Sequence, residues 1–295
     1  MKIYLSILIS LFLIIKPVLA APNACDRLIQ VFGANREGVK IGQVKLFMDK
    51  CLIESRDDNY IDTVPAADND YGSKPISNTV ACKPSGPQPF NIISKIKAGT
   101  VKIREKTSTK DLTQFMKDSG QDFDTEFQKF HTQGLMYGNL GIKIEPEIVS
   151  ISTPSSIGRA QFCQYISNVH YEAGYDDLLV YVSKDTPKQS CEYYFTLRHE
   201  LIHASISRKT LAKYIPIIES QIKNAFDKEN FYYQELRAGQ KPDTKFNDLI
   251  SYKINQEILL PLQNKISEEL QTQNNMFDYD ESTKREERMS SFCSN

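Results

Sequence analysis

The sequence lacks several features that point to particular classes of protein. It has no Trp, no Asn-X-Ser/Thr glycosylation acceptor and, after its first twenty residues, no apolar run long enough to span a membrane. Lys and Arg (36) balance Asp and Glu (37), so a net charge of −1 gives no reason to expect a nucleic acid or an acidic membrane surface as partner. With 40% apolar residues and no low-complexity segment, the composition is that of a globular protein.

The first twenty residues are typical of a secretory signal peptide. Lys2 is followed by an apolar run from Ile3 to Ile15 and by a small-residue cleavage pattern that ends at Ala20. The run is shorter than the roughly 20 residues that cross a bilayer. We therefore expect residues 1–20 to be removed and the mature protein to be exported, to the periplasm or the extracellular medium, without membrane insertion.

The cysteines agree with export. All six follow residue 20, and an even number without a CxxC pair favours disulfide bonds over a cysteine zinc site. Their connectivity does not follow from the sequence. The local expectation is a Cys163–Cys191 bond, because these two bracket a short unit that contains a predicted strand. Cys25 could instead be a lipid-modified first residue, in which case it would not form a disulfide.

Two regions follow the signal peptide. Residues 21–99 hold two short apolar stretches and then, from Ser55 to Pro89, a segment rich in Asp, Asn, Ser, Pro and Gly that reads as loop. We expect residues 21–99 to be an N-terminal Cys-containing region or a removable pro-segment. Residues 100–295 form the expected main domain.

The main domain begins with predicted strands and continues with predicted helices. Hydrophobic spacing predicts a helical segment in which Leu112, Phe115 and Met116, and then Phe123, Phe127 and Phe130, recur. Alternating apolar residues predict strands at 101–104, 142–151 and 178–182. Residues 192–270 read as mostly helical with breaks at prolines, and residues 271–295 as a polar tail held by Cys293 if that residue is bridged. This order predicts an α+β fold, with a small mixed sheet followed by a mostly helical C-terminal half.

The segment around residue 200 carries the strongest chemical signal. His199, Glu200 and His203 form an HExxH motif, which on a helix places the two imidazoles on one face, four residues apart, where they can hold one Zn²⁺. The surrounding residues are apolar nearly all round, so the helix is predicted to be buried. A buried pair of neutral histidines without a metal would leave several polar atoms to satisfy, which favours the metal site.

On these residues the chain resembles the zincin metallopeptidases. The resemblance implies a zinc-dependent endopeptidase, with a mixed sheet before the metal helix and an edge strand that binds an extended polypeptide substrate; residues 178–182 are the nominee for that strand. The metzincin branch is excluded because Ile206 and Lys209 stand where it has Gly and His. The resemblance to the gluzincin branch implies a third ligand, a glutamate on a later helix.

Glu235 is the leading candidate for this third ligand. If residues 231–238 are helical, its carboxylate shares a stripe with Phe231 and Ala238, and a carboxylate on such a face needs a cation. Glu219 is the runner-up, while Glu229 and Asp227 stay open.

The resemblance also implies a mechanism. One Zn²⁺ per chain lowers the pKa of its bound water and polarises the substrate carbonyl, while Glu200 acts as general base. A second donor to the developing oxyanion is expected from Tyr232, Tyr233 or His170, with Arg237 as a further candidate.

Two other functions compete with the peptidase. The first is a secreted, disulfide-stabilised zincin-fold protein that binds a partner, or acts as an effector, without cutting. The second is an exported disulfide-bonded protein without metal. The intact Glu200 argues against a site that has lost its chemistry, because a purely structural zinc needs no general base.

Overall fold

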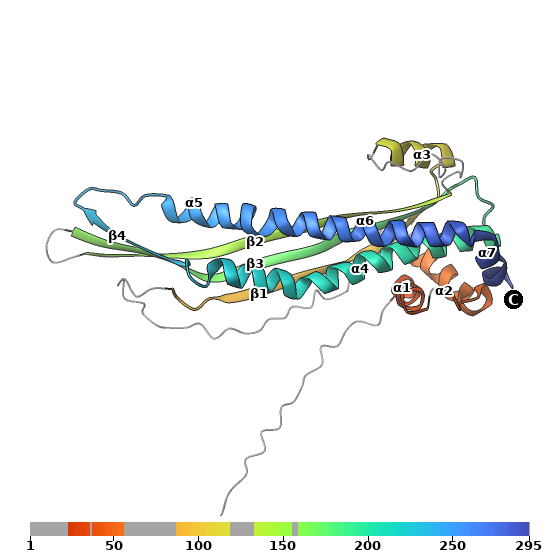
Figure 1. Cartoon of the computed structure of the whole chain (residues 1–295), viewed down its shortest axis with the longest axis horizontal. Coiled ribbons are helices and arrows are strands. Elements are labelled where there is room, and N and C mark those ends of the chain that lie inside the picture. The colour runs from red at the N-terminus through yellow and green to blue at the C-terminus, as the bar shows by residue number, and fades with distance from the viewer. Residues whose placement is uncertain (1–22, 36, 56–86, 119–132, 155–158, 295) are drawn as a thin grey trace, which may run out of the picture.

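The computed structural model describes residues 23–35, 37–55, 87–118, 133–154 and 159–294. The expected signal peptide and most of the loop-like segment lie outside these residues. The fold is α+β, as predicted, with a four-stranded mixed sheet, a long helix and a mostly helical C-terminal half (Figure 1).

Two very long strands dominate the sheet. Strand β3 (Arg159–Val182) pairs in parallel with β1 (Asn91–Arg104) on one side and antiparallel with β2 (Gly134–Pro154) on the other. The short β4 (Phe231–Arg237) pairs antiparallel with the first residues of β3. At about 3.3 Å per residue, β3 alone extends roughly 80 Å, which explains the elongated shape in Figure 1.

Helix α4 (Cys191–Phe226) follows β3 and packs on the sheet. Its first turn is capped by Ser190, whose Oγ accepts a hydrogen bond from the Tyr193 N–H at 3.1 Å. Every second side chain of β3 is buried over most of its length, and these residues share one core with the apolar side chains of α4. Helix α6 (Leu260–Thr283) packs along α4. The remaining helices are α1 (Ala24–Ala34), α2 (Ile41–Glu54), α3 (Thr109–Asp118), α5 (Lys245–Tyr252), a π-helix (Lys253–Leu259) and α7 (Arg285–Cys293).

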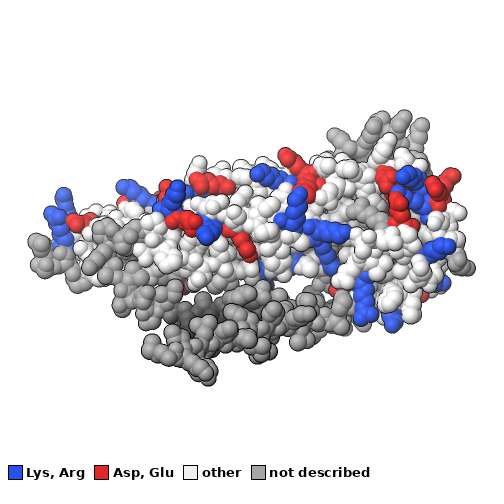
Figure 2. Space-filling model, turned by 60° about the horizontal axis from the view of Figure 1, so that its bottom comes forward, with Lys and Arg blue, Asp and Glu red and all other residues white. Residues whose placement is uncertain are grey.

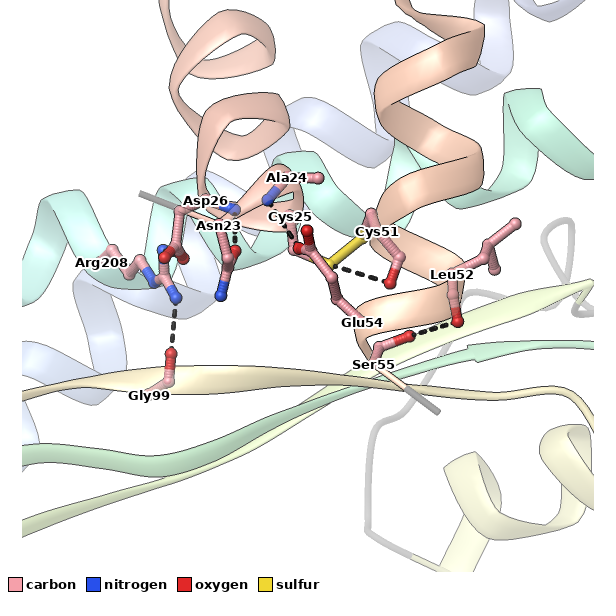
Figure 3. The surroundings of a disulfide bond; sticks show 10 residues. All are labelled: Asn23, Ala24, Cys25, Asp26, Cys51, Leu52, Glu54, Ser55, Gly99 and Arg208. Atoms are coloured by element: carbon pink, nitrogen blue, oxygen red, sulfur yellow. Dashed lines mark hydrogen bonds and ion pairs between the residues drawn. A yellow bond between two sulfur atoms is a disulfide. The ribbon is translucent and has the colours of Figure 1, made fainter. Parts of the chain in front are cut away.

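Helices α1 and α2 belong to the same core as α4. The Cys25–Cys51 disulfide joins them, and Phe32 and Met48 are fully buried. Arg208 of α4 ties the pair to the sheet, because its guanidinium donates to Asp26 of α1 at 2.7 Å and to the Gly99 carbonyl of β1 at 2.5 Å (Figure 3). Strand β1 runs across residue 99, where the sequence suggested a boundary.

Several local predictions from the sequence are wrong. Cys191 pairs with Cys293 rather than with Cys163, which is itself disulfide-bonded. Residues 178–182 form the C-terminal end of β3. Because β1 and β2 pair with them on either side, they lie inside the sheet and are not an edge strand. Residues 231–237 are strand β4 instead of helix, and the expected polar tail is the end of α6 together with α7.

The other strand predictions are confirmed, and so is the helix at Leu112, which is α3; Phe123, Phe127 and Phe130 lie outside the described residues.

The disulfides indicate an oxidising compartment. No helix in the described part of the chain combines the length and the apolar character that crossing a membrane requires. On the face shown in Figure 2, positive and negative side chains are interspersed.

Candidate metal centre

Helices α4 and α6 bring together three side chains that could hold a metal ion. His199 and His203 project from adjacent turns of α4, and Asp278 projects from α6. The two imidazole Nε2 atoms are 3.1 Å apart, and Asp278 Oδ1 lies 3.2 Å from that of His199 and 2.9 Å from that of His203.

This triangle fits the ligand set of a tetrahedral metal ion. Nitrogen and oxygen ligands at about 2.0–2.1 Å from zinc lie about 3.3 Å from one another when the coordination is tetrahedral. The three observed separations are close to that edge length. The side chains of His199 and Asp278 are 21% and 31% exposed, so the group is accessible from solvent, as a site with a further coordination position requires.

The hydrogen bonds around the triangle also suit a metal. The buried Asp278 Oδ1 faces the Nε2 atoms of both His199 and His203. Asn274 Oδ1 lies 2.9 Å from His203 Nδ1, on the far side of the ring. An acceptor there holds the proton on Nδ1 and leaves the Nε2 lone pair for a metal, which is the usual arrangement of ligating histidines.

Phe277 fixes the two rings from α6. Its ring centroid lies 4.8 Å from that of His199 and 5.1 Å from that of His203. Because Phe277 is 4% exposed, it excludes water from one side of both imidazoles and restricts their rotation.

Electrostatics couple the members of the group. Burial would raise the pKa of Asp278, but the two imidazoles outweigh it and hold this pKa well below its usual range. Burial likewise would lower the pKa of His203, yet the neighbouring Asp278 and Glu200 raise it to about 9. Here the positive charge beside Asp278 is that of an imidazolium, and a metal cation bound in its place would displace that proton and supply the charge instead.

Glu200 lies beside the triangle and is buried, with a relative exposure of 4%. Its pKa is raised by burial, while the positive charge of His199 and His203 and a hydrogen bond from the Met136 backbone oppose that shift. The start of β2 passes so close that a Cβ on Gly134 would lie 2.6 Å from Glu200 Oε1. Strand β2 therefore borders the carboxylate that the sequence marks as general base.

Glu235, the expected third ligand, is not at this site. It lies on β4, where it accepts a hydrogen bond from Arg159 at 3.2 Å, and its side chain is 53% exposed. Its partner on β3 is Gln161, whereas Gly134 pairs with Val182 at the other end of that strand. At about 3.3 Å per residue these positions are roughly 70 Å apart, so the structure places Asp278, and not Glu235, beside the histidines.

The other candidates have partners elsewhere. Among the proposed oxyanion donors, Tyr232 donates to Asp243, Tyr233 donates to Glu235, and His170 is half-exposed near Glu147. Among the alternative ligands, Glu219 accepts from Tyr171, Glu229 pairs with Lys253, and Asp227 caps the C-terminus of α4.

Asp278 and Asn274 were missed because they lie in the segment read as a tail. One signal for a continued helix was present: the helical spacing of Leu262, Ile266 and Leu270 extends into this segment at Phe277. Comparison with protein-family models, with curated proteins and with solved structures finds no match for this chain.

Proposed function

We propose that the protein is an exported zinc-dependent metallopeptidase that uses His199, His203 and Asp278 as ligands. The observation that carries this proposal is the triangle of ligand atoms with Glu200 next to it on the same helix. A set of two imidazoles and one carboxylate suits zinc. Bound there, zinc would supply a Lewis acid for a peptide carbonyl and lower the pKa of water at the remaining position.

Glu200 is the proton carrier in this proposal. Its burial keeps the carboxylate away from bulk solvent, and the raised pKa brings it closer to neutrality, where a group that accepts and returns a proton works best. Asn274 and Phe277 keep the imidazoles oriented, so that neither ring has to reorganise during the reaction.

The proposed substrate is an extended polypeptide that lies along β2. This strand pairs with β3 on one side, and no strand in the described part of the chain pairs with its other side. Its first residues border Glu200. A peptide that adds to this edge would gain backbone hydrogen bonds and pass the metal group.

Glu200→Gln tests the proposal, because it removes the proton acceptor without touching a ligand. We expect zinc-loaded wild-type protein to cleave members of a mixed peptide library. The cleavage rate of the variant should be about 100- to 10,000-fold lower. Zinc content, measured by mass spectrometry, stays at one per chain in both. The matched control is Glu235→Gln, the same exchange on β4, which leaves activity and zinc content unchanged.

The results also separate the alternatives. Zinc bound without cleavage of any library peptide would favour a partner-binding protein with the same site. Iron in place of zinc would point to a two-histidine, one-carboxylate iron centre and would contradict the peptidase.

A further inference from the structure

A buried ion cluster lies next to the metal group on the same two helices. Arg198 precedes His199 on α4, and Glu281 follows Asp278 by three residues on α6. The Glu281 carboxylate accepts a hydrogen bond at 3.0 Å from Arg198 and another at 3.0 Å from Arg288 of α7. The side chains of Arg198 and Glu281 are each 3% exposed.

Aromatic rings hold Arg198 in place, and two further carboxylates hold Arg288. The Arg198 guanidinium lies over the rings of Phe195 and Phe292, at 5.3 and 5.7 Å from their centroids. Arg288 also pairs with Glu37, which precedes α2, at 2.6 Å and with Asp280 of α6 at 2.7 Å. The carboxylate of Glu281 is thus fixed by groups from α4 and α7.

The cluster is the first of four side-chain contacts along the interface between α4 and α6. Contacts of later residues on α4 are made by earlier residues on α6, so the helices are antiparallel. The pairs are Arg198–Glu281, His199–Asp278, His203–Asn274 and Lys213–Glu269. A slip of α6 by one residue would move Asp278 by about 1.5 Å and turn it by about 100°, away from the imidazoles.

We infer that Glu281 is a positioning residue for the metal group: clamped by Arg198 and Arg288, it fixes the register that presents Asp278 to His199 and His203. A buried ion pair adds little net stability compared with apolar packing, but its geometry can specify one register. The Lys213–Glu269 pair does not have this capacity, because Lys213 is 59% exposed. The inference rests on the proposed function only in requiring that the triangle binds a metal.

The test compares zinc affinity, by competition with a chelating dye, in wild type, Glu281→Gln, Asp278→Asn and the double variant. Loss of a group bonded directly to a ligand costs about 10- to 100-fold in affinity. Because Glu281 acts on Asp278 through the helix register, we expect the lower end of that range, about 10-fold, for Glu281→Gln. In the Asp278→Asn background the same exchange should change affinity less than about twofold, because the carboxylate that it positions is already gone. With Co²⁺ as probe, Glu281→Gln should alter the visible spectrum in the same way as Asp278→Asn.

Glu269→Gln is the matched control, since it makes the same exchange on α6 at a pair whose lysine is 59% exposed, and it should leave zinc affinity and the Co²⁺ spectrum unchanged. If Glu281→Gln does not fold, Arg198→Lys replaces it, because lysine keeps the charge but loses the fork geometry. Two results would overturn the inference while the metal site stands. One is wild-type zinc affinity in a folded Glu281→Gln or Arg198→Lys protein. The other is an equal loss of zinc affinity on Glu281→Gln with and without the Asp278 carboxylate. Absence of metal binding by wild type would overturn both.

Discussion

Gly134 offers a way to disturb Glu200 without changing any ligand. A Cβ at this position would lie 2.6 Å from Glu200 Oε1 and 2.7 Å from Thr196 Cγ2. Carbon and oxygen atoms in ordinary contact are about 3.5 Å apart, so in Gly134→Ala the carboxylate must retreat by nearly 1 Å. The β-branched Thr196 on the same helix has little rotamer freedom to yield instead.

A displacement of about 1 Å in a catalytic group costs on the order of 100-fold in rate. We therefore expect kcat/KM of Gly134→Ala for a cleaved peptide to fall by about 100-fold, which corresponds to about 2.7 kcal/mol of transition-state stabilisation. Zinc affinity should stay within a few-fold of wild type, because His199, His203 and Asp278 are untouched. The overpacking itself should lower the free energy of unfolding by about 1–3 kcal/mol.

Gly141→Ala is the matched control on the same strand. The nearest atom to its added Cβ is the Gly174 carbonyl oxygen at 3.9 Å, an ordinary contact. This variant should keep wild-type activity and zinc affinity. If Gly134→Ala also keeps full activity, or loses zinc and activity together, Glu200 does not act where the structure places it.

Three further predictions concern one ligand, the residue that orients another ligand, and one disulfide. Asp278→Ala should lower zinc affinity by more than about 100-fold, because loss of a ligand weakens binding more than loss of a group that only orients a ligand. Asn274→Ala should lower it by about 10- to 100-fold, since the His203 ring loses the acceptor that orients it. Replacing both Cys191 and Cys293 by Ser should reduce the free energy of unfolding in urea by about 4.7 kcal/mol, because the bond closes a loop with a sequence separation of 102 residues.

The two predictions on zinc affinity have controls. Glu235→Ala should bind zinc like wild type, and Asn274→Asp, which keeps an acceptor at the same place, should retain most of the affinity. Unchanged zinc binding in Asp278→Ala would contradict the ligand assignment. An unfolding midpoint in urea that does not change when the disulfide is absent would contradict its role in holding α7 to α4.

The sequence predicted those parts of the site that lie within one turn of each other. His199, Glu200 and His203 are on a single helix, so their spacing alone places them together. Asp278 is brought to them by tertiary packing across a gap of 75 residues, which no local pattern reports. A helix was assumed around Glu235, but Phe231, Tyr232 and Tyr233 are also strong strand formers, and pairing with β3 decided the outcome.

The same limit explains the misread tail. Helix α6 loses most of its apolar residues after Leu270, and hydropathy therefore marks the segment as exposed. What α6 buries there is one ring, Phe277, and one carboxylate: Glu281 is 2% exposed because it meets Arg198 and Arg288. Burial through paired charges leaves no hydrophobic pattern to detect.

The central claim, a metal ion held by His199, His203 and Asp278, is tested most directly by X-ray absorption spectroscopy at the zinc edge of the purified mature protein. We expect one zinc per chain, with two imidazole nitrogens and oxygen ligands at about 2.0–2.1 Å, and a loss of one protein oxygen ligand in Asp278→Ala. A protein that carries no zinc after equilibration with it, or a zinc environment that is identical in wild type and Asp278→Ala, would contradict the claim.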